Sequence, residues 1–312
     1  MAVLTNNGNT CFLNSTLQCL SAVEQLDSIL KTLKEQQQVE YVLTKEYLDL
    51  RQLMKNNHMI SPQRFVNAVK YVAGKKQREL FTGHVQNDLP EFLMFMVECF
   101  HTALSRKINI SLNSTNDKLA ETCYNMFKET YSDDFSEIIQ LFFGIHVSTI
   151  YSGDAVRSIK PEPFFMLNLS IGPETKTLYD CLDLYCENEH LKHDNAWFNE
   201  TTQTKENVHK NIRIWSWPNC LVIDLKRVNN NNKKNNVNIQ IPLELNLTNY
   251  STKERDYTFD LVAVCNHVGN SYGGHYTAHV KRESKWVLYN DDQCSEEPLN
   301  TSNAYCLFYN KR

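Results

Sequence analysis

Apolar residues recur at helical spacing through roughly the first third of the chain. Leu13, Leu17 and Leu20 follow Cys11 at intervals that place them on one face of a helix starting at the cysteine. Three further segments show the same spacing, and two of them open on a polar residue of the kind that favours helix starts. The helices predicted in this way span 11–23, 39–54, 61–74 and 88–104.

The pattern changes near residue 138 to short apolar runs that are rich in aromatic and β-branched residues. Such runs are typical of strands, and they predict a second half that is mainly β. A run of asparagine and lysine from 229 to 236 gains nothing by burial, so we expect a mobile loop there. The first strands predicted in this way lie at 142–147, 164–169 and 221–225.

Two strands near the end of the chain are predicted to pair with each other. Apolar and polar residues alternate on both sides of a short polar turn, which is the pattern of an antiparallel hairpin. Pairing Lys281 with Trp286 across that turn places Asn290 and Asp291 within a rung or two of His275.

Composition is typical of a globular protein that folds on its own. Hydrophobic residues make up 42% of the 312 residues, and we expect one domain over 1–312. A net charge of −4 argues against nucleic acid as a partner. No apolar stretch is long enough to cross a bilayer, so we expect no membrane partner either.

The ten cysteines show no regular spacing and no C-x-x-C pair. A disulfide framework is therefore not expected. The first residues lack the charged and apolar segments of a secretion signal. We expect an intracellular protein, cytoplasmic and/or nuclear, that is monomeric and needs no cofactor.

Cys11 is the first candidate for chemistry. A thiol at the first turn of a helix faces unpaired backbone N–H groups and the positive end of the helix dipole, and both favour the thiolate. Gly8 permits a tight turn before it, which can aim N–H groups and the Asn6 amide at an oxyanion. On local chemistry alone, an ordinary buried thiol is the alternative.

His275 is the candidate base. Asn290 or Asp291 can hold its ring in one tautomer, as the third group of a catalytic triad does. Gly273 and Gly274 directly before it leave room for the backbone of a peptide substrate. On these residues alone, a structural histidine and a simple loop bend are the alternatives.

Ordered blocks of residues resemble the ubiquitin-specific protease family, the papain-like cysteine proteases that cleave after the C-terminal glycine of ubiquitin. The block Asn-Asn-Gly-Asn-Thr-Cys-Phe-Leu-Asn-Ser at 6–15 is similar to the family's cysteine box. The blocks at 262–276, with Gly-Gly-His-Tyr, and at 286–292 are similar to its histidine box. Two further family segments look like 86–92 and 221–227.

The resemblance implies roles for particular residues. Cys11 would attack the carbonyl carbon of the terminal glycine, and His275 would take the thiol proton and later give one to the leaving amine. Asn290 occupies the family's third triad position with Asp291 beside it, and Asn6 matches the residue that stabilises the oxyanion. The residues implied to contact the substrate are Asp88, Glu91, Gly273, Gly274 and Tyr276.

The fold implied by the resemblance is an α+β, papain-like cysteine protease with right-hand architecture. A helical thumb would span about 1–137, mainly fingers 138–228 and a palm 229–312. Many members bind Zn²⁺ in the fingers through two C-x-x-C pairs, but the corresponding stretches here hold no cysteine. We therefore expect no metal, and fingers that are held by strand pairing and packing.

The function implied is thiol-dependent hydrolysis of the (iso)peptide bond after the C-terminal glycine of ubiquitin, through an acyl-enzyme on Cys11. Ubiquitin and ubiquitinated proteins would be the partners. Two alternatives are open: a protease for another ubiquitin-like modifier, or a ubiquitin-binding scaffold without turnover. The scaffold is disfavoured because Cys11, His275 and Asn290 are all retained.

Overall fold

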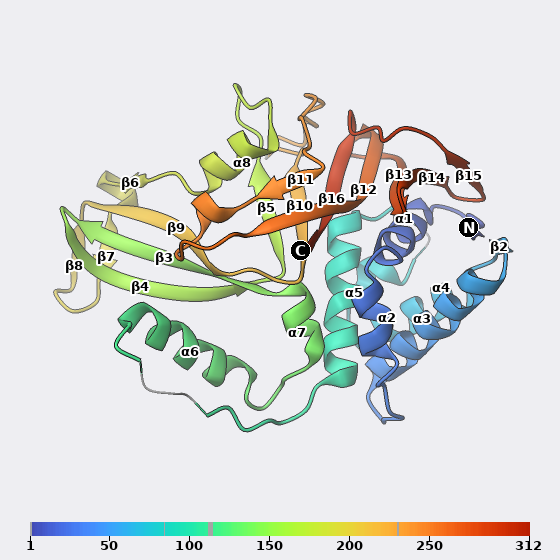
Figure 1. The fold of residues 1–312 in the computed structure, drawn as a ribbon, viewed down its shortest axis with the longest axis horizontal. Coiled ribbons are helices and arrows are strands. Elements are labelled where there is room, and N and C mark those ends of the chain that lie inside the picture. Colours follow the sequence, from blue (N-terminus) through green and yellow to red (C-terminus); the bar gives the residue numbers. More distant parts are fainter. Residues whose placement is uncertain (1, 84, 112–114, 230) are drawn as a thin grey trace.

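The computed structural model describes residues 2–83, 85–111, 115–229 and 231–312. Most helices gather at one end, and strands form a central sheet and a long arm that extends away from them (Figure 1). The helices are α1 (Cys11–Leu20), α2 (Glu24–Leu30), α3 (Val39–Asn56), α4 (Gln63–Lys75), α5 (Leu89–Leu104), α6 (Lys118–Tyr131), α7 (Glu137–Phe142) and α8 (Leu178–Tyr185), with short 3-10 turns η1 (Glu79–Phe81), η2 (His193–Asn195) and η3 (Thr248–Tyr250).

The strands fall into a central sheet, an arm and a short parallel pair near the N-terminus. They are β1 (Val3–Leu4), β2 (Met59–Ile60), β3 (Gly144–Ser152), β4 (Ala155–Phe164), β5 (Met166–Ser170), β6 (Glu189–Leu191), β7 (Trp197–Asn199), β8 (Thr204–Glu206), β9 (Val208–Ser216), β10 (Cys220–Lys226), β11 (Glu244–Asn246), β12 (Thr258–Asn270), β13 (Gly273–Arg282), β14 (Lys285–Asn290), β15 (Gln293–Glu296) and β16 (Ala304–Lys311).

The central sheet lies between two hydrophobic cores. Among the described residues it has eight strands, in the order β15-β14-β13-β12-β16-β10-β5, with β11 paired to β12. Its neighbours are antiparallel except β10 and β5. One face packs against the helical end, above all α1 and α5, and the other packs against α8. The sheet thus carries β13 and β14 directly against α1.

Helix α1 is enclosed on every side, since all of its residues are buried between β13 and α5. Its start at Cys11 confirms the first predicted helix. The helices predicted at 39–54, 61–74 and 88–104 are confirmed as α3, α4 and α5, with ends shifted by at most two residues. These segments were the most predictable because each keeps an apolar face at helical spacing over several turns.

Several elements were missed or misplaced. Helices α2, α6 and α7 were not predicted. The strand expected at 142–147 starts only at Gly144, because the preceding apolar residues end α7. The strand expected at 164–169 covers the end of β4 and most of β5. Short apolar runs do not distinguish a buried helix from a strand, which explains these errors.

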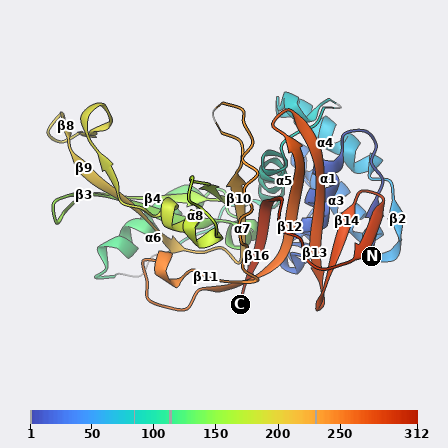
Figure 2. The same ribbon diagram turned by 90° about the horizontal axis from the view of Figure 1, so that it is seen from above.

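The arm consists of a four-stranded sheet, β4-β3-β9-β6, with the small pair β7-β8 at its far end (Figures 1 and 2). Antiparallel pairing holds it together, above all the long ladder between β3 and β4. In the part of the chain that the structure describes, no three His, Cys, Asp or Glu side chains are placed to hold a metal ion. Strands β5 and β10 from 138–228 join the central sheet, and the limits of thumb, fingers and palm stay predictions.

The predicted hairpin near the end of the chain is confirmed as β13 and β14, with Lys281 opposite Trp286. The ladder stops at Ala278 and Tyr289, however, and does not continue to Asp291 as the register alone suggested. The reason is the backbone of Asp291, whose φ of +50° turns the chain away from β13 into β15. The side chains after β14 therefore reach towards the N-terminal segment.

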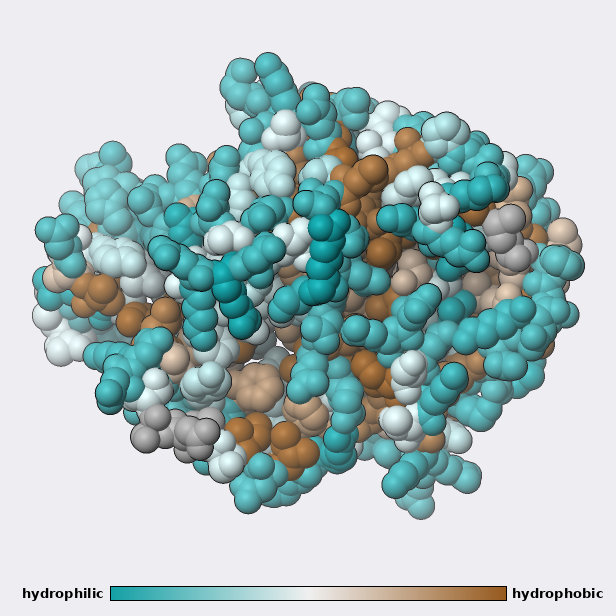
Figure 3. Space-filling view, in the orientation of Figure 1, coloured by the Kyte–Doolittle hydropathy of each residue, from teal (hydrophilic) through white to brown (hydrophobic). Residues whose placement is uncertain are grey.

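The surface seen in Figure 3 is mostly hydrophilic, with hydrophobic residues in small separate patches. Within the described residues, none of the helices combines the length and the apolar character that a membrane crossing needs.

Candidate active site

Cys11 opens α1 at the point where the helix meets the central sheet. Cys11 is only 2% exposed to solvent. The chain enters the helix through a turn with positive φ at Gly8 (+95°) and Asn9 (+55°), the first of which glycine adopts without strain. The backbone N–H groups of Tyr276 and Phe12 are near enough to the thiol to lower its pKa. The thiol thus lies beside β13, at the residue after His275.

The surroundings raise the pKa of Cys11. Burial is the largest cause and the charge of Asp291 adds to it, while the N–H groups of Tyr276 and Phe12 act in the opposite direction. The N–H groups at the start of the helix lower the pKa of Cys11, as expected, but lost hydration outweighs them and the net shift is upward. At neutral pH the residue is mainly a thiol, and it needs a base.

His275 lies on β13, and Asn290 at the end of β14 holds its ring. The imidazole Nε2 is 2.6 Å from Oδ1 of Asn290. An amide oxygen only accepts hydrogen bonds, so Nε2 carries the hydrogen and Nδ1 of the neutral ring carries the lone pair. The side chain of His275 is 44% exposed, which leaves it accessible to a substrate. This is the arrangement that a general base oriented by a third group requires.

Asp291 has different partners from Asn290. Its Oδ2 accepts from Nδ2 of Asn6 at 2.8 Å, and its Oδ1 accepts from Nδ2 of Asn14, also at 2.8 Å. Its carboxylate is 3.9 Å from Nε2 of His275. Asp291 therefore connects the sheet to both the N-terminal segment and α1, while Asn290 makes the direct contact with the imidazole.

Asn6 organises the turn before Cys11. Its Oδ1 accepts from the backbone N–H groups of Gly8 (2.9 Å) and Thr10 (3.3 Å) and from the Thr10 hydroxyl (3.1 Å). Its Nδ2 uses one hydrogen on Asp291. The second hydrogen of the same nitrogen is the donor that an oxyanion would use.

A groove of about 280 Å³ lies next to the residues that flank His275 and takes in three of the five predicted substrate contacts, Asp88, Gly273 and Tyr276. Asp88 stands at the N-cap of α5 but makes no side-chain cap hydrogen bond. Its Oδ1 instead accepts from the hydroxyls of Tyr276 (3.1 Å) and Tyr305 (2.9 Å). Lost hydration raises the pKa of Asp88, and the two hydroxyls oppose that change.

The two glycines before His275 have a structural reason within the chain itself. A β-carbon at Gly274 would lie 2.3 Å from the carbonyl oxygen of Val268, and one at Gly273 would lie 2.7 Å from the Gln86 amide oxygen. Gln86 bonds to both backbone groups of Gly274, accepting from its N–H and donating to its C=O, each at 2.9 Å. The glycines thus let the chain pack on itself, and the predicted passage for a substrate backbone stays a prediction.

Two predicted contacts are not in the lining of the groove: one is Gly274, the residue after Gly273 in β13, and the other is Glu91. It is exposed on the first turn of α5 and is absent from the groove's lining among the described residues. Three residues that contact the site were missed: Asn14, Gln86 and Tyr305. Asn14 lies one helical turn after Cys11, and this spacing was the available signal.

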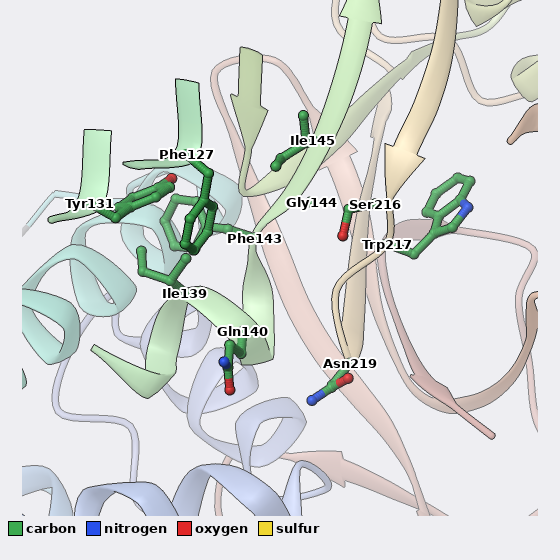
Figure 4. Close-up of a pocket in the computed structure, with 10 residues that line it drawn as sticks. All are labelled: Phe127, Tyr131, Ile139, Gln140, Phe143, Gly144, Ile145, Ser216, Trp217 and Asn219. Atoms are coloured by element: carbon green, nitrogen blue, oxygen red, sulfur yellow. The ribbon is translucent and has the colours of Figure 1, made fainter. Parts of the chain in front are cut away.

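A second hollow of similar volume does not belong to this site. Figure 4 shows a cavity of about 290 Å³ where α6 and α7 approach the base of the arm, with Phe127, Tyr131 and Trp217 in its lining. None of the candidate residues described above lines it. The chemistry therefore concentrates at the junction of α1, β13 and β14.

Comparison with known proteins gives consistent results. Residues 3–309 match the family described as ubiquitin carboxyl-terminal hydrolase. Ubiquitin carboxyl-terminal hydrolase Usp2 of Drosophila melanogaster is 30% identical over 337 residues, and the match covers 99% of this chain and 34% of that protein. Ubiquitin carboxyl-terminal hydrolase 2 of Bos taurus is 30% identical over 336 residues, covering 99% and 55%. The chain thus spans between a third and just over half of these relatives.

A solved structure supports the fold. The structure of the SAGA Ubp8/Sgf11/Sus1/Sgf73 DUB module bound to ubiquitin aldehyde matches with a TM-score of 0.76 at 24% identity, covering 100% of this chain and 70% of that chain. The expected α+β, papain-like fold is therefore confirmed. With the family match over nearly its whole length, the chain belongs to the ubiquitin carboxyl-terminal hydrolase family.

Proposed function

We propose that this chain is a deubiquitinase that hydrolyses the (iso)peptide bond after the C-terminal glycine of ubiquitin. One observation carries the proposal: α1 packs against β13 so that the backbone N–H of Tyr276 lowers the pKa of Cys11, while the residue before Tyr276, His275, is held by Asn290. Nucleophile, base and orienting group thus meet at one point of the fold, although they come from opposite ends of the chain.

The first half of the reaction forms an acyl-enzyme. Nδ1 of His275 takes the proton of the Cys11 thiol, and the sulfur attacks the carbonyl carbon of the terminal glycine. The carbonyl oxygen becomes an oxyanion, to which the second N–H of the Asn6 amide donates. As the C–N bond breaks, the imidazolium gives its proton to the leaving amine, and glycine remains bound to Cys11 as a thioester.

The second half releases ubiquitin. His275 takes a proton from a water molecule, the resulting hydroxide attacks the thioester carbonyl, and the sulfur leaves and recovers the proton. Asn290 acts throughout by holding Nε2–H, so the ring presents Nδ1 to the reacting atoms in both steps. The raised pKa of Cys11 makes this base necessary in the first step.

The groove supplies the recognition. Both tyrosines use the same oxygen of Asp88, which leaves Oδ2 for a basic side chain of the ubiquitin tail. The similar proteins support ubiquitin as the substrate. The two relatives are ubiquitin carboxyl-terminal hydrolases, and the similar solved module is bound to ubiquitin aldehyde.

A ubiquitin with a C-terminal electrophile tests the proposal. It should label the wild-type chain on Cys11, and Cys11→Ala should abolish labelling. Cys294→Ala is the matched control, because Cys294 is the exposed thiol among ten free cysteines and would react if labelling were unspecific. No labelling of the wild type, or equal labelling of Cys11→Ala, would overturn the proposal.

The same experiment separates the two alternatives. Stronger labelling by a probe built on another ubiquitin-like modifier would assign that modifier as the substrate. Binding of ubiquitin without labelling or hydrolysis would assign the scaffold. We further propose that the chain works inside the cell, where its ten free thiols stay reduced, and as a monomer, to be checked by light scattering.

A further inference from the structure

The asparagine- and lysine-rich loop after β10, which we predicted to be mobile, makes contacts with the rest of the protein through its described residues. Val228 and Lys234 form an antiparallel bridge across it. Nη1 of the buried Arg227 donates to the carbonyl oxygens of Asn235 (3.0 Å) and Val237 (2.9 Å). The loop rises beside the hairpin that joins β12 to β13 (Figure 2).

Lys234 makes the contact between this loop and that hairpin. Its Nζ lies 2.7 Å from the carbonyl oxygen of His267, 2.9 Å from Nδ1 of the same residue and 3.4 Å from the carbonyl oxygen of Gly269. An ammonium group has three donors, and these three acceptors use all of them. Within the described residues, no carboxylate forms an ion pair with Lys234, and the hydrogen bonds of its ammonium group all go to the end of β12.

His267, the residue that Lys234 contacts, itself packs against the residues on either side of the candidate base. Because Lys234 donates to Nδ1, the neutral ring carries its hydrogen on Nε2. Nε2 lies 2.5 Å from the position that a β-carbon on Gly274 would take, and the ring packs on Tyr276 with centroids 4.4 Å apart. Gly274 and Tyr276 are the two neighbours of His275, and His267 therefore borders both of them.

The charges around His267 agree with a neutral ring. Burial is the main reason that its pKa is lowered to about 4, and Lys234 and His275 lower it further. The other groups that face it are the rings of Tyr276 and Tyr305. The ring thus stays an acceptor for Lys234 at the pH at which the protein would work.

We propose that Lys234 is a positioning residue for the reaction: through His267 it fixes the hairpin that presents Gly273 and Gly274 to the substrate. The inference rests on the proposed function. Without Lys234 the hairpin keeps its hydrogen bonds to Gln86 but loses its contact with the loop, so part of its ordering has to occur when substrate binds, and that cost falls on binding. The chemical step is spared, because Asn290 still holds the imidazole of His275.

Three variants test this on the full chain. Lys234→Met keeps the length of the side chain and removes the donors. Lys233→Met is the matched control, since Lys233 is the exposed neighbour and bonds to Asn229 only through its backbone. Lys234→Arg restores a charged donor. The readouts are kcat and KM for a ubiquitin–fluorophore substrate, together with a melting curve for each variant.

We expect Lys234→Met to raise KM about fivefold or more with kcat within about twofold, and Lys234→Arg to recover at least half of the loss. Lys233→Met should match the wild type. Equal KM values for the two methionine variants would overturn the proposal. A fall in kcat as large as the rise in KM, together with a lowered melting temperature, would also overturn it, because a lysine with only a structural role would give that result.

A second arm needs no substrate and separates this inference from the proposed function. In nuclear magnetic resonance spectra at neutral pH, the wild-type His267 should show the Nε2–H tautomer. The amide signals of Gly273 and Gly274 should shift in Lys234→Met and not in Lys233→Met. If the wild type does not cleave ubiquitin, the proposed function is wrong, but the amide signals still test the positioning role of Lys234. A shift of these signals in Lys234→Met supports that role, and unchanged signals overturn it.

Discussion

The imidazole of His275 lies 2.6 Å from the Asn290 amide oxygen and 3.9 Å from the carboxylate of Asp291, so the neutral neighbour makes the direct contact. The charged neighbour is committed to the amides of Asn6 and Asn14. Two consecutive residues at the end of β14 thus have separate tasks. This division leads to the first two predictions.

Asn290→Ala should lower kcat roughly 10- to 100-fold and leave KM within about threefold, because the ring loses the acceptor that fixes its tautomer. Asn290→Asp keeps an acceptor at the same place and should retain most of the activity. Steady-state hydrolysis of a ubiquitin–fluorophore substrate measures both, with the exposed neighbour Gln293 changed to Ala as the control. An Asn290→Ala enzyme as fast as this control would contradict the assignment.

Asp291→Ala should destabilise the fold. It removes the 2.8 Å hydrogen bonds that the carboxylate accepts from the amides of Asn6 and Asn14, and Asn14 keeps only the longer contacts, at 3.3 Å, with the carbonyl oxygens of Leu4 and Thr5. A hydrogen bond to a charged group contributes about 1.5–3 kcal/mol, and the free energy of unfolding in urea should fall by about that amount. Asp292→Ala, at the exposed next position, should leave it unchanged. Equal stability of the two variants would rule out the anchoring role.

Alkylation of Cys11 should depend steeply on pH. Its raised pKa means that the reactive thiolate is scarce at pH 7, so the rate with iodoacetamide should rise about tenfold per pH unit towards pH 9. Removing the negative charge in Asp291→Ala should move this curve to lower pH. Mass spectrometry of the labelled peptides gives the rate, with the exposed Cys294 as the internal reference. A plateau below pH 7 would show a thiolate at rest instead.

Cys11 and the loop at 229–236 show which parts of the structure could be predicted from the sequence and which could not. The helix at Cys11 followed from spacing alone, because its apolar residues repeat over three turns. The loop shows no such repeat, and its anchoring depends on single long side chains such as Lys234, whose partners are distant in sequence. The partners of Asp291 could not be predicted from the sequence either. The predicted register extends the β13–β14 ladder to Asp291, but the chain turns at this residue, which has a positive φ, and the ladder ends before it.

Asp224 on β10 should make stability depend on pH. Burial, then the charge of Asp88, raises its pKa to about 7, and Lys226 opposes this. Between the ordinary carboxyl pKa of 3.8 and about 7, the folded state holds a proton that the unfolded chain has released. The stability that this proton contributes is present at low pH and is lost as the pH rises through about 7.

Asp224→Asn removes this dependence. Relative to the wild type, its free energy of unfolding should rise by about 1–3 kcal/mol between pH 4 and pH 8, a range reduced for the partial exposure of the side chain. Urea unfolding at several pH values measures it, and Asp154→Asn on an exposed turn serves as the control. Parallel curves for the variant and the wild type would contradict the prediction.

Gly269 and Gly274 face each other across the β12–β13 hairpin, and each excludes a side chain from the other. A β-carbon on Gly269 would lie 2.5 Å from the α-carbon of Gly274, and one on Gly274 would lie 3.0 Å from the α-carbon of Gly269. Since each of the two positions is blocked by main-chain atoms, a second substitution elsewhere cannot relieve both obstacles. Random mutagenesis with selection for turnover should therefore recover no replacements at this pair, while the exposed Asp154, on the turn between β3 and β4, should vary freely.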